Sequence, residues 1–86
     1  MMQEGYTVAD LRRTQGRVVG LKQTARAVAE GRAREVYLAC DADPRLTEPL
    51  KNACGTGVSL HMEMTMAQLG KAAGIAVGTA ACALLG

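Results

Sequence analysis

Basic and amide side chains cluster at one predicted helix start, within residues 20–26. The first turn of a helix has unpaired backbone N–H groups and the positive end of the helix dipole, so it normally attracts anions. Lys22 and Arg26 place positive charge near this positive helix end, which is unfavourable, and at a spacing of four residues they also repel each other. An external polyanion relieves both penalties, and the amide of Gln23 can both donate to and accept from a base edge. The pattern formed by Gly20, Leu21 and these three side chains therefore predicts a nucleic-acid partner.

A pair of carboxylates, Asp41 and Asp43, offers a competing chemistry after an apolar segment. Two carboxylates at the end of a strand can hold Mg²⁺ or attack phosphorus. Asp43 precedes Pro44, however, and this order is typical of a helix N-cap followed by proline at the first helical position. With no further acidic cluster and no catalytic lysine arrangement in support, we expect no catalytic residue and a protein that is not an enzyme.

Metal-ligating side chains are isolated from one another in the sequence. His61 is the single histidine and has no cysteine or carboxylate partner at ligand spacing, which favours a surface or edge-strand position. Cys40, Cys54 and Cys82 are widely spaced, form no CxxC pair and lie in apolar segments. They indicate small, reduced core residues in a cytoplasmic protein, and we expect no metal site and no cofactor.

Charge is distributed unevenly along the chain, although the net charge is only +2. Seven basic residues and a single acidic one, Glu30, lie within residues 12–34. The basic ones are Arg12, Arg13, Arg17, Lys22, Arg26, Arg32 and Arg34. A positive face on an otherwise acidic body suits a specific polyanion site, while the plain alternative is a solvated surface. Two tyrosines are the only aromatic residues, so an RNA-binding module that stacks bases on an aromatic platform is excluded.

Length limits the chain to one domain, residues 1–86. A chain of this size buries only about 60 to 65% of its unfolded surface, which leaves no room for a large enclosed active site. The longest largely apolar run, residues 75–85, is well short of the about 20 residues that a membrane helix needs. The N-terminal residues lack a basic region followed by an apolar stretch, so we expect no secretory signal and no membrane partner.

Helical and strand patterns alternate along the chain, which predicts one α/β domain. The second helix is expected to turn Leu21, Ala25, Val28 and Ala29 inward. Thr65 is expected to cap the fourth helix. The predicted helices cover residues 7–14, 22–30, 44–54 and 66–73, and the predicted strands cover residues 17–19, 36–40, 58–62 and 79–85.

The segment that leads into the last predicted strand can be interpreted in two ways. Ile75, Ala76 and Val77 lie between Gly74 and Gly78 and can simply enter the strand. Alternatively, they form an apolar wall beside the basic helix start, against which an unstacked base packs. The pattern alone leaves both open.

Three segments, in this order and at this spacing, resemble the L7Ae/L30e family of large-subunit ribosomal proteins, in particular its small bacterial kink-turn-binding members. They are residues 20–27 (GLKQTARA), 36–44 (VYLACDADP) and 69–77 (LGKAAGIAV), and the resemblance extends over about residues 8–85. The resemblance implies a three-layer α/β/α sandwich with a four-stranded mixed sheet. It also implies binding of a kink-turn, a sharp RNA bend followed by tandem sheared G·A pairs.

Site roles follow from the same resemblance. Gly20 approaches the RNA backbone, and Lys22, Gln23 and Arg26 address the G·A pairs and nearby phosphates. Ile75, Ala76 and Val77 line the contact with the extruded bulge nucleotide. Archaeal and eukaryotic members usually carry Asn-Glu where this chain has Lys22 and Gln23, which looks like the bacterial variant.

The sequence thus predicts a monomeric, cytoplasmic RNA-binding protein without a cofactor. Its RNA host is ribosomal RNA, a riboswitch or another structured leader, and ribosome membership is left open. The leading alternative is a protein-interaction or scaffold module in which Ile75 and Val77 meet a protein partner and the basic face is solvated.

Overall fold

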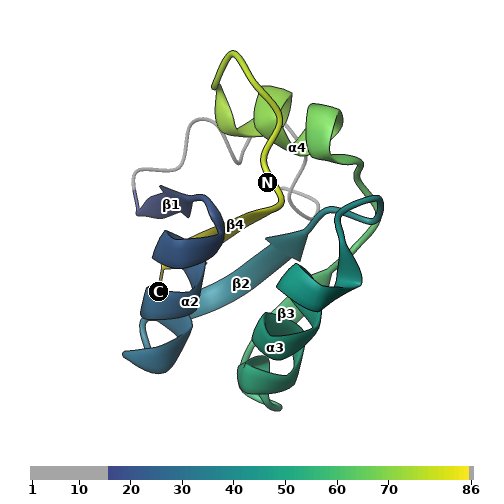
Figure 1. Ribbon diagram of the computed structural model, residues 1–86. Coiled ribbons are helices and arrows are strands. Elements are labelled where there is room, and N and C mark those ends of the chain that lie inside the picture. The colour runs from purple at the N-terminus through teal and green to yellow at the C-terminus, as the bar shows by residue number, and fades with distance from the viewer. Residues whose placement is uncertain (1–15, 86) are drawn as a thin grey trace.

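A four-stranded mixed sheet with three helices makes up residues 16–85, the part of the chain that the computed structural model describes (Figure 1). The helix expected over residues 7–14 lies outside the described residues. The strands are β1 (Arg17–Val19), β2 (Ala33–Leu38), β3 (Ser59–His61) and β4 (Ala81–Leu85), and the helices are α2 (Leu21–Ala29), α3 (Pro44–Cys54) and α4 (Met66–Ala73).

The last strand in the chain lies inside the sheet, whose order is β1-β4-β2-β3. β4 runs antiparallel to both β1 and β2, whereas β2 and β3 are parallel. Ala81, Cys82 and Ala83 of β4 are fully buried, and their small side chains let helices pack closely on the sheet. This topology brings the start of the described chain and its end side by side.

Side chains alternate between two cores along the strands, as the period of a strand dictates. Val36 and Leu38 of β2 pack with residues of α2 and α3 on one face. Tyr37 of the same strand packs with Leu69 and other residues of α4 on the opposite face. The predicted sandwich of helices on both faces of a four-stranded mixed sheet is confirmed.

Several predicted boundaries are wrong by a few residues. α2 begins at Leu21 rather than residue 22, and β2 covers Ala33–Leu38 rather than residues 36–40. β4 begins at Ala81, so residues 74–80 form a loop and not the start of the strand. Cys40 consequently follows β2 and is exposed, although Cys54 and Cys82 are buried as predicted. Burial raises the pKa of the Cys82 thiol to about 11.

The predicted inward face of α2 is right for Leu21 and Val28, which pack against the core, and wrong for Ala25 and Ala29. Thr24 and Ala27 are the buried residues of this helix, while Ala25 and Ala29 are exposed. Leu21 and Val28 are half-buried. The apolar stripe of α2 is broad, and Thr24 and Ala27 are buried while Ala25 and Ala29 are turned toward α3. Apolar spacing alone did not identify the buried edge of the stripe.

Candidate nucleic-acid interface

The start of α2 is an uncapped helix end. Gly20 precedes the helix with φ 106°, a left-handed value that favours glycine, and no side chain at this position caps the helix. The first helical hydrogen bond runs from Thr24 N to Gly20 O (2.9 Å). The N–H groups of Leu21, Lys22 and Gln23 precede it, so they are available to an anion. A Cβ at Gly20 would meet nothing within 4 Å, so the backbone here is open to close approach.

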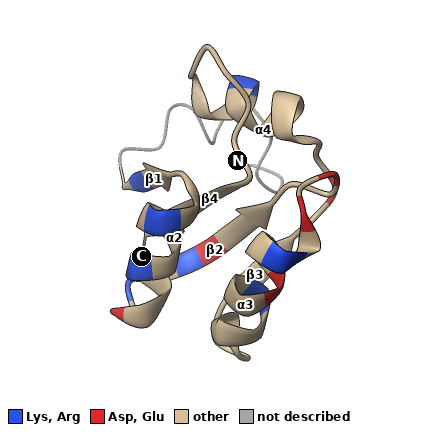
Figure 2. Cartoon of the chain, viewed as in Figure 1, with Lys and Arg blue, Asp and Glu red and all other residues tan. Residues whose placement is uncertain are grey.

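Three exposed polar side chains surround that helix end. Lys22 and Gln23 form no hydrogen bond or ion pair with the residues that the structure describes, and α2 carries no acidic residue. Arg26 Nε lies 4.0 Å from Glu30 Oε2, and both side chains are largely exposed. An exposed pair at that separation is weak, and Glu30 is closer to Arg32, at 2.8 Å. Figure 2 shows the basic residues of α2 in blue along the helix.

A loop, residues 74–80, carries the apolar residues of the predicted site. Val77 is 71% exposed, Ala76 is exposed and Ile75 is half-buried. The loop is fixed to α4 by hydrogen bonds from Ile75 N to Gly70 O (3.0 Å) and from Thr79 N to Met66 O (3.1 Å). These side chains are therefore not part of the last strand.

Glycine lets this loop lie directly on α4. The Val77 carbonyl is packed against Gly70, where any Cβ would overlap it. Gly74 ends the helix with φ 81°, a conformation that other residues rarely adopt. The sequence Gly70–Gly74 thus sets the path of the loop that exposes Val77.

A backbone hydrogen bond brings the two predicted segments to the same end of the sheet. Gly20 N donates to Ala81 O (2.8 Å), one step beyond the pairing of Val19 with Cys82 in the β1–β4 ladder. Ala81 is the residue at which the loop enters β4. Figure 1 shows the N-terminal end of α2 and the loop at one end of the sheet. The basic helix start and the point where the apolar loop enters β4 are therefore neighbours in the backbone.

The two carboxylates that suggested phosphotransfer are occupied in helix capping. Asp43 Oδ1 accepts from Arg45 N (2.9 Å) at the start of α3, as predicted. Its side-chain hydrogen bonds to Arg45 lower the pKa of this carboxyl. Asp41 Oδ1 accepts from Met66 N (2.8 Å) at the start of α4, a contact over 25 residues that the sequence did not reveal. Both side chains thus have structural tasks.

His61 also has partners that the sequence did not predict. Its Nε2 lies 2.8 Å from Glu35 Oε1, and its ring stacks on Tyr37 with centroids 4.5 Å apart. Within residues 16–85, no group of three or more histidine, cysteine or acidic side chains is arranged to hold a metal. No helix in this part of the chain has the length and apolar character to cross a membrane.

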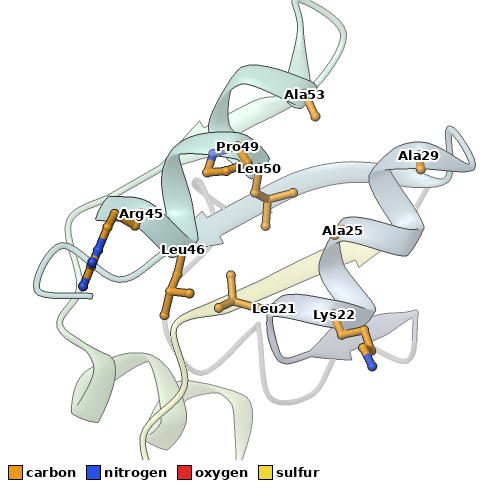
Figure 3. Close-up of a pocket in the computed structure, with 9 residues that line it drawn as sticks. All are labelled: Leu21, Lys22, Ala25, Ala29, Arg45, Leu46, Pro49, Leu50 and Ala53. Carbon is orange, nitrogen blue, oxygen red and sulfur yellow. The ribbon is translucent and has the colours of Figure 1, made fainter. Parts of the chain in front are cut away.

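An open apolar groove of about 460 Å³ lies between α2 and α3 (Figure 3). Leu21 points into it toward Leu46 and Leu50, whereas the Lys22 ammonium points out of it. Leu46 is 54% exposed. Leu21 therefore belongs to the predicted site through its backbone N–H, and its side chain packs toward α3.

Comparison with protein families gives a match over nearly the whole chain. The model of the ribosomal protein L7Ae/L30e/S12e/Gadd45 family matches residues 4–85. A protein named RNA-binding protein from Bacillus pumilus (strain SAFR-032) is 42% identical over 69 residues, 79% of this chain and 84% of the relative. RNA-binding protein YbxF of Geobacillus stearothermophilus is 45% identical over 69 residues, with the same shares of the two chains.

Solved structures show the same architecture. A Giardia lamblia 15.5kD RNA binding protein superposes with a TM-score of 0.81 at 27% identity, over 92% of this chain and 68% of that one. A protein of unknown function from Bacillus halodurans superposes with a TM-score of 0.77 at 22% identity, over 90% of this chain and 78% of that one. The second likeness concerns the fold alone.

Proposed function

The chain belongs to the ribosomal protein L7Ae/L30e/S12e/Gadd45 family, and from this premise we propose that it is an RNA-binding protein that recognises kink-turns. The observation that supports the proposal most is the Gly20–Ala81 hydrogen bond. It connects the start of α2, which we assign to phosphates and base edges, with the end of the loop that we assign to an unstacked base. The similar proteins that are named for RNA binding point to the same class of partner.

Electrostatics at the start of α2 fit an RNA backbone. Free N–H groups and the helix dipole favour phosphate, and Lys22 and Arg26 add positive charge without an acidic residue on the helix. Gln23 is exposed beside them, and its amide can both donate to and accept from a purine edge. Charge then gives affinity, and Gln23 gives discrimination.

A bent target fits this surface better than a regular duplex does. The major groove of A-form RNA is deep and too narrow for protein side chains to read its bases. A kink-turn opens that groove, concentrates phosphates from both stems and frees a bulged nucleotide. The exposed Val77, with Ala76 and Ile75 beside it, offers an apolar wall for that base.

Sequencing the RNA that the tagged protein retains from a bacterial extract tests this function. We expect enrichment of RNAs that place tandem G·A pairs next to a bulge, in ribosomal RNA, a riboswitch or another leader. The Gln23→Ala variant is the matched control and should lose that enrichment while still retaining bulk RNA through its charge.

Ribonuclease treatment separates this function from the alternative. A protein that binds RNA as a monomer should retain no partner after digestion. Protein partners that survive digestion and depend on Val77, with no enriched RNA class, would instead identify a protein-interaction module and overturn the proposal.

A further inference from the structure

Arg17 is a cation whose charge is directed into the fold. It lies in β1 opposite Leu84, a residue of the core on the α4 side of the sheet, so its side chain points to that side. Its Nη2 donates to the carbonyl oxygen of Ala73 at 3.0 Å, across 56 residues of sequence. Arg17 is thus tied to the C-terminal end of α4 rather than extended into solvent.

This placement has an energetic cost that packing alone does not explain. Arg17 Nε is buried and has no hydrogen-bond partner among the described residues. Burying an unpaired polar atom is unfavourable, and an aliphatic side chain would avoid it. A guanidinium does, however, satisfy a helix-end carbonyl that lacks an intrahelical partner, and its charge complements the negative end of the helix dipole. The side chain is therefore suited to hold the end of α4.

The end of α4 is where the apolar loop of the predicted site begins. Ala73 is the last residue of α4, and the loop runs from Gly74 to its entry into β4 at Ala81. Ala81 in turn accepts from Gly20, which directly follows β1. One end of the loop is therefore held by the Arg17 side chain of β1, and the other end is held by the backbone of Gly20, the residue after β1.

From this arrangement we propose that Arg17 is a positioning residue, which sets the loop carrying Val77 in place against the basic start of α2. The inference rests on the proposed RNA-binding function. In this proposal, Arg17 affects RNA binding through the position of the loop. It does not itself contact a phosphate, although it belongs to the basic stretch of the sequence.

Substitution by Met and by Lys tests this role. R17M keeps an unbranched stem of similar length and removes every donor, while R17K keeps a charge and a donor for Ala73. We expect R17M to weaken binding to a kink-turn RNA by about fivefold, in the range of couplings within a hydrogen-bonded network, with an unchanged salt slope. R17K should recover most of the affinity. Lys51→Met, which removes an exposed cation in the last turn of α3, serves as the control and should bind as the parent protein does.

A double-mutant cycle with Val77→Ser distinguishes positioning from direct contact. If Arg17 acts through the loop, R17M should have little further effect once the Val77 contact is gone. An equal loss of affinity in both backgrounds, or a salt slope that falls by about one, would instead place Arg17 on a phosphate and overturn the proposal.

Hydrogen exchange in the free protein gives a readout that needs no RNA. The Ile75 N–H, which is bonded to Gly70 O, should exchange faster in R17M and regain protection in R17K. Unchanged exchange at Ile75 and Thr79 would overturn the positioning role, whatever the RNA results. Faster exchange together with no RNA binding by any variant, the parent included, would leave the positioning of the loop intact and reject the proposed function.

Discussion

Two arginines in the described part of the basic stretch are engaged within the protein. Arg17 is bound to Ala73, and Arg32 is paired with Glu30 at 2.8 Å. Lys22 and Arg26 are the exposed cations at the start of α2, and only Arg26 has an acidic neighbour, at 4.0 Å. The charge of the site is therefore concentrated at one helix end, which accounts for a local positive surface on a chain of net charge +2.

Lys22→Ala and Gln23→Ala are expected to fail in different ways, because one removes charge and the other removes hydrogen bonds to a base. Lys22→Ala should weaken binding and reduce the salt slope by about one, the value for a phosphate contact. Gln23→Ala should cost about 1 to 3 kcal/mol, the range for a good base contact, with the slope nearly unchanged. Affinity titrations at several salt concentrations measure both quantities.

Lys51→Ala is the control for this pair, since Lys51 is exposed in the last turn of α3. It should leave both quantities close to those of the parent protein. Identical changes of slope and affinity in the Lys22 and Gln23 variants would contradict the separation of charge from base recognition.

The helices differ in how well the sequence predicts them. Asp43 before Pro44 and Thr65 before α4 mark helix starts through local chemistry, and the structure has both caps. The face of α2 was not predictable in this way, because Thr24 and Ala27 are the buried residues of the helix while Ala25 and Ala29, of similar size, line the groove toward α3. Apolar periodicity identifies a helix but does not say which edge of a broad stripe is buried.

Contacts between distant segments could not be predicted from the sequence, for a different reason. Asp41 binds the start of α4, and Arg17 binds its end. Each pairing joins residues whose local context already offers another role, one as a possible catalytic carboxylate and the other as a surface cation. The candidate site residues at the start of α2 and in the loop belong to locally defined turns, and their roles in RNA binding stay predictions.

Gly70→Ala tests the packing of the loop on α4. Alanine in a helix normally stabilises the folded protein by about 1 kcal/mol relative to glycine, but here the new Cβ would overlap the Val77 carbonyl. We expect the overlap to win, with a loss of about 1 to 3 kcal/mol of stability and weaker RNA binding as the loop moves. Thermal unfolding and an RNA titration measure the two effects.

Gly57→Ala is the matched control, because a Cβ at Gly57 meets nothing within 4 Å. It should change neither the melting temperature nor the affinity appreciably. A Gly70→Ala variant that melts higher than the parent protein would show that the loop does not depend on this close contact.

The whole molecule brings two distant segments together through the position of one strand. Because β4 lies between β1 and β2, the loop before β4 is delivered beside Gly20, which follows β1. α2 and α4 pack on opposite faces of the sheet, so neither helix could place both parts of the predicted site alone. The order of the strands thus brings the basic start of α2 and the end of the apolar loop together.

The proposed recognition of a bent RNA has a direct consequence for the RNA itself. A ligand that prefers one conformer shifts the population toward that conformer. Phosphates are present in every RNA, but an opened groove, sheared-pair edges and a freed base exist together only in the kinked form. The protein should therefore fold an extended kink-turn, and not merely coat it.

Fluorescence resonance energy transfer between dyes on the two stem ends of a kink-turn RNA measures this most directly. Transfer should rise when the protein is added at low Mg²⁺, where the free RNA is mostly extended. Replacing the tandem G·A pairs with Watson–Crick pairs should abolish the rise and leave only weak, salt-sensitive binding. If the substituted duplex binds as tightly as the kink-turn at moderate salt, and transfer does not change, the surface is a general polyanion patch and the account is contradicted.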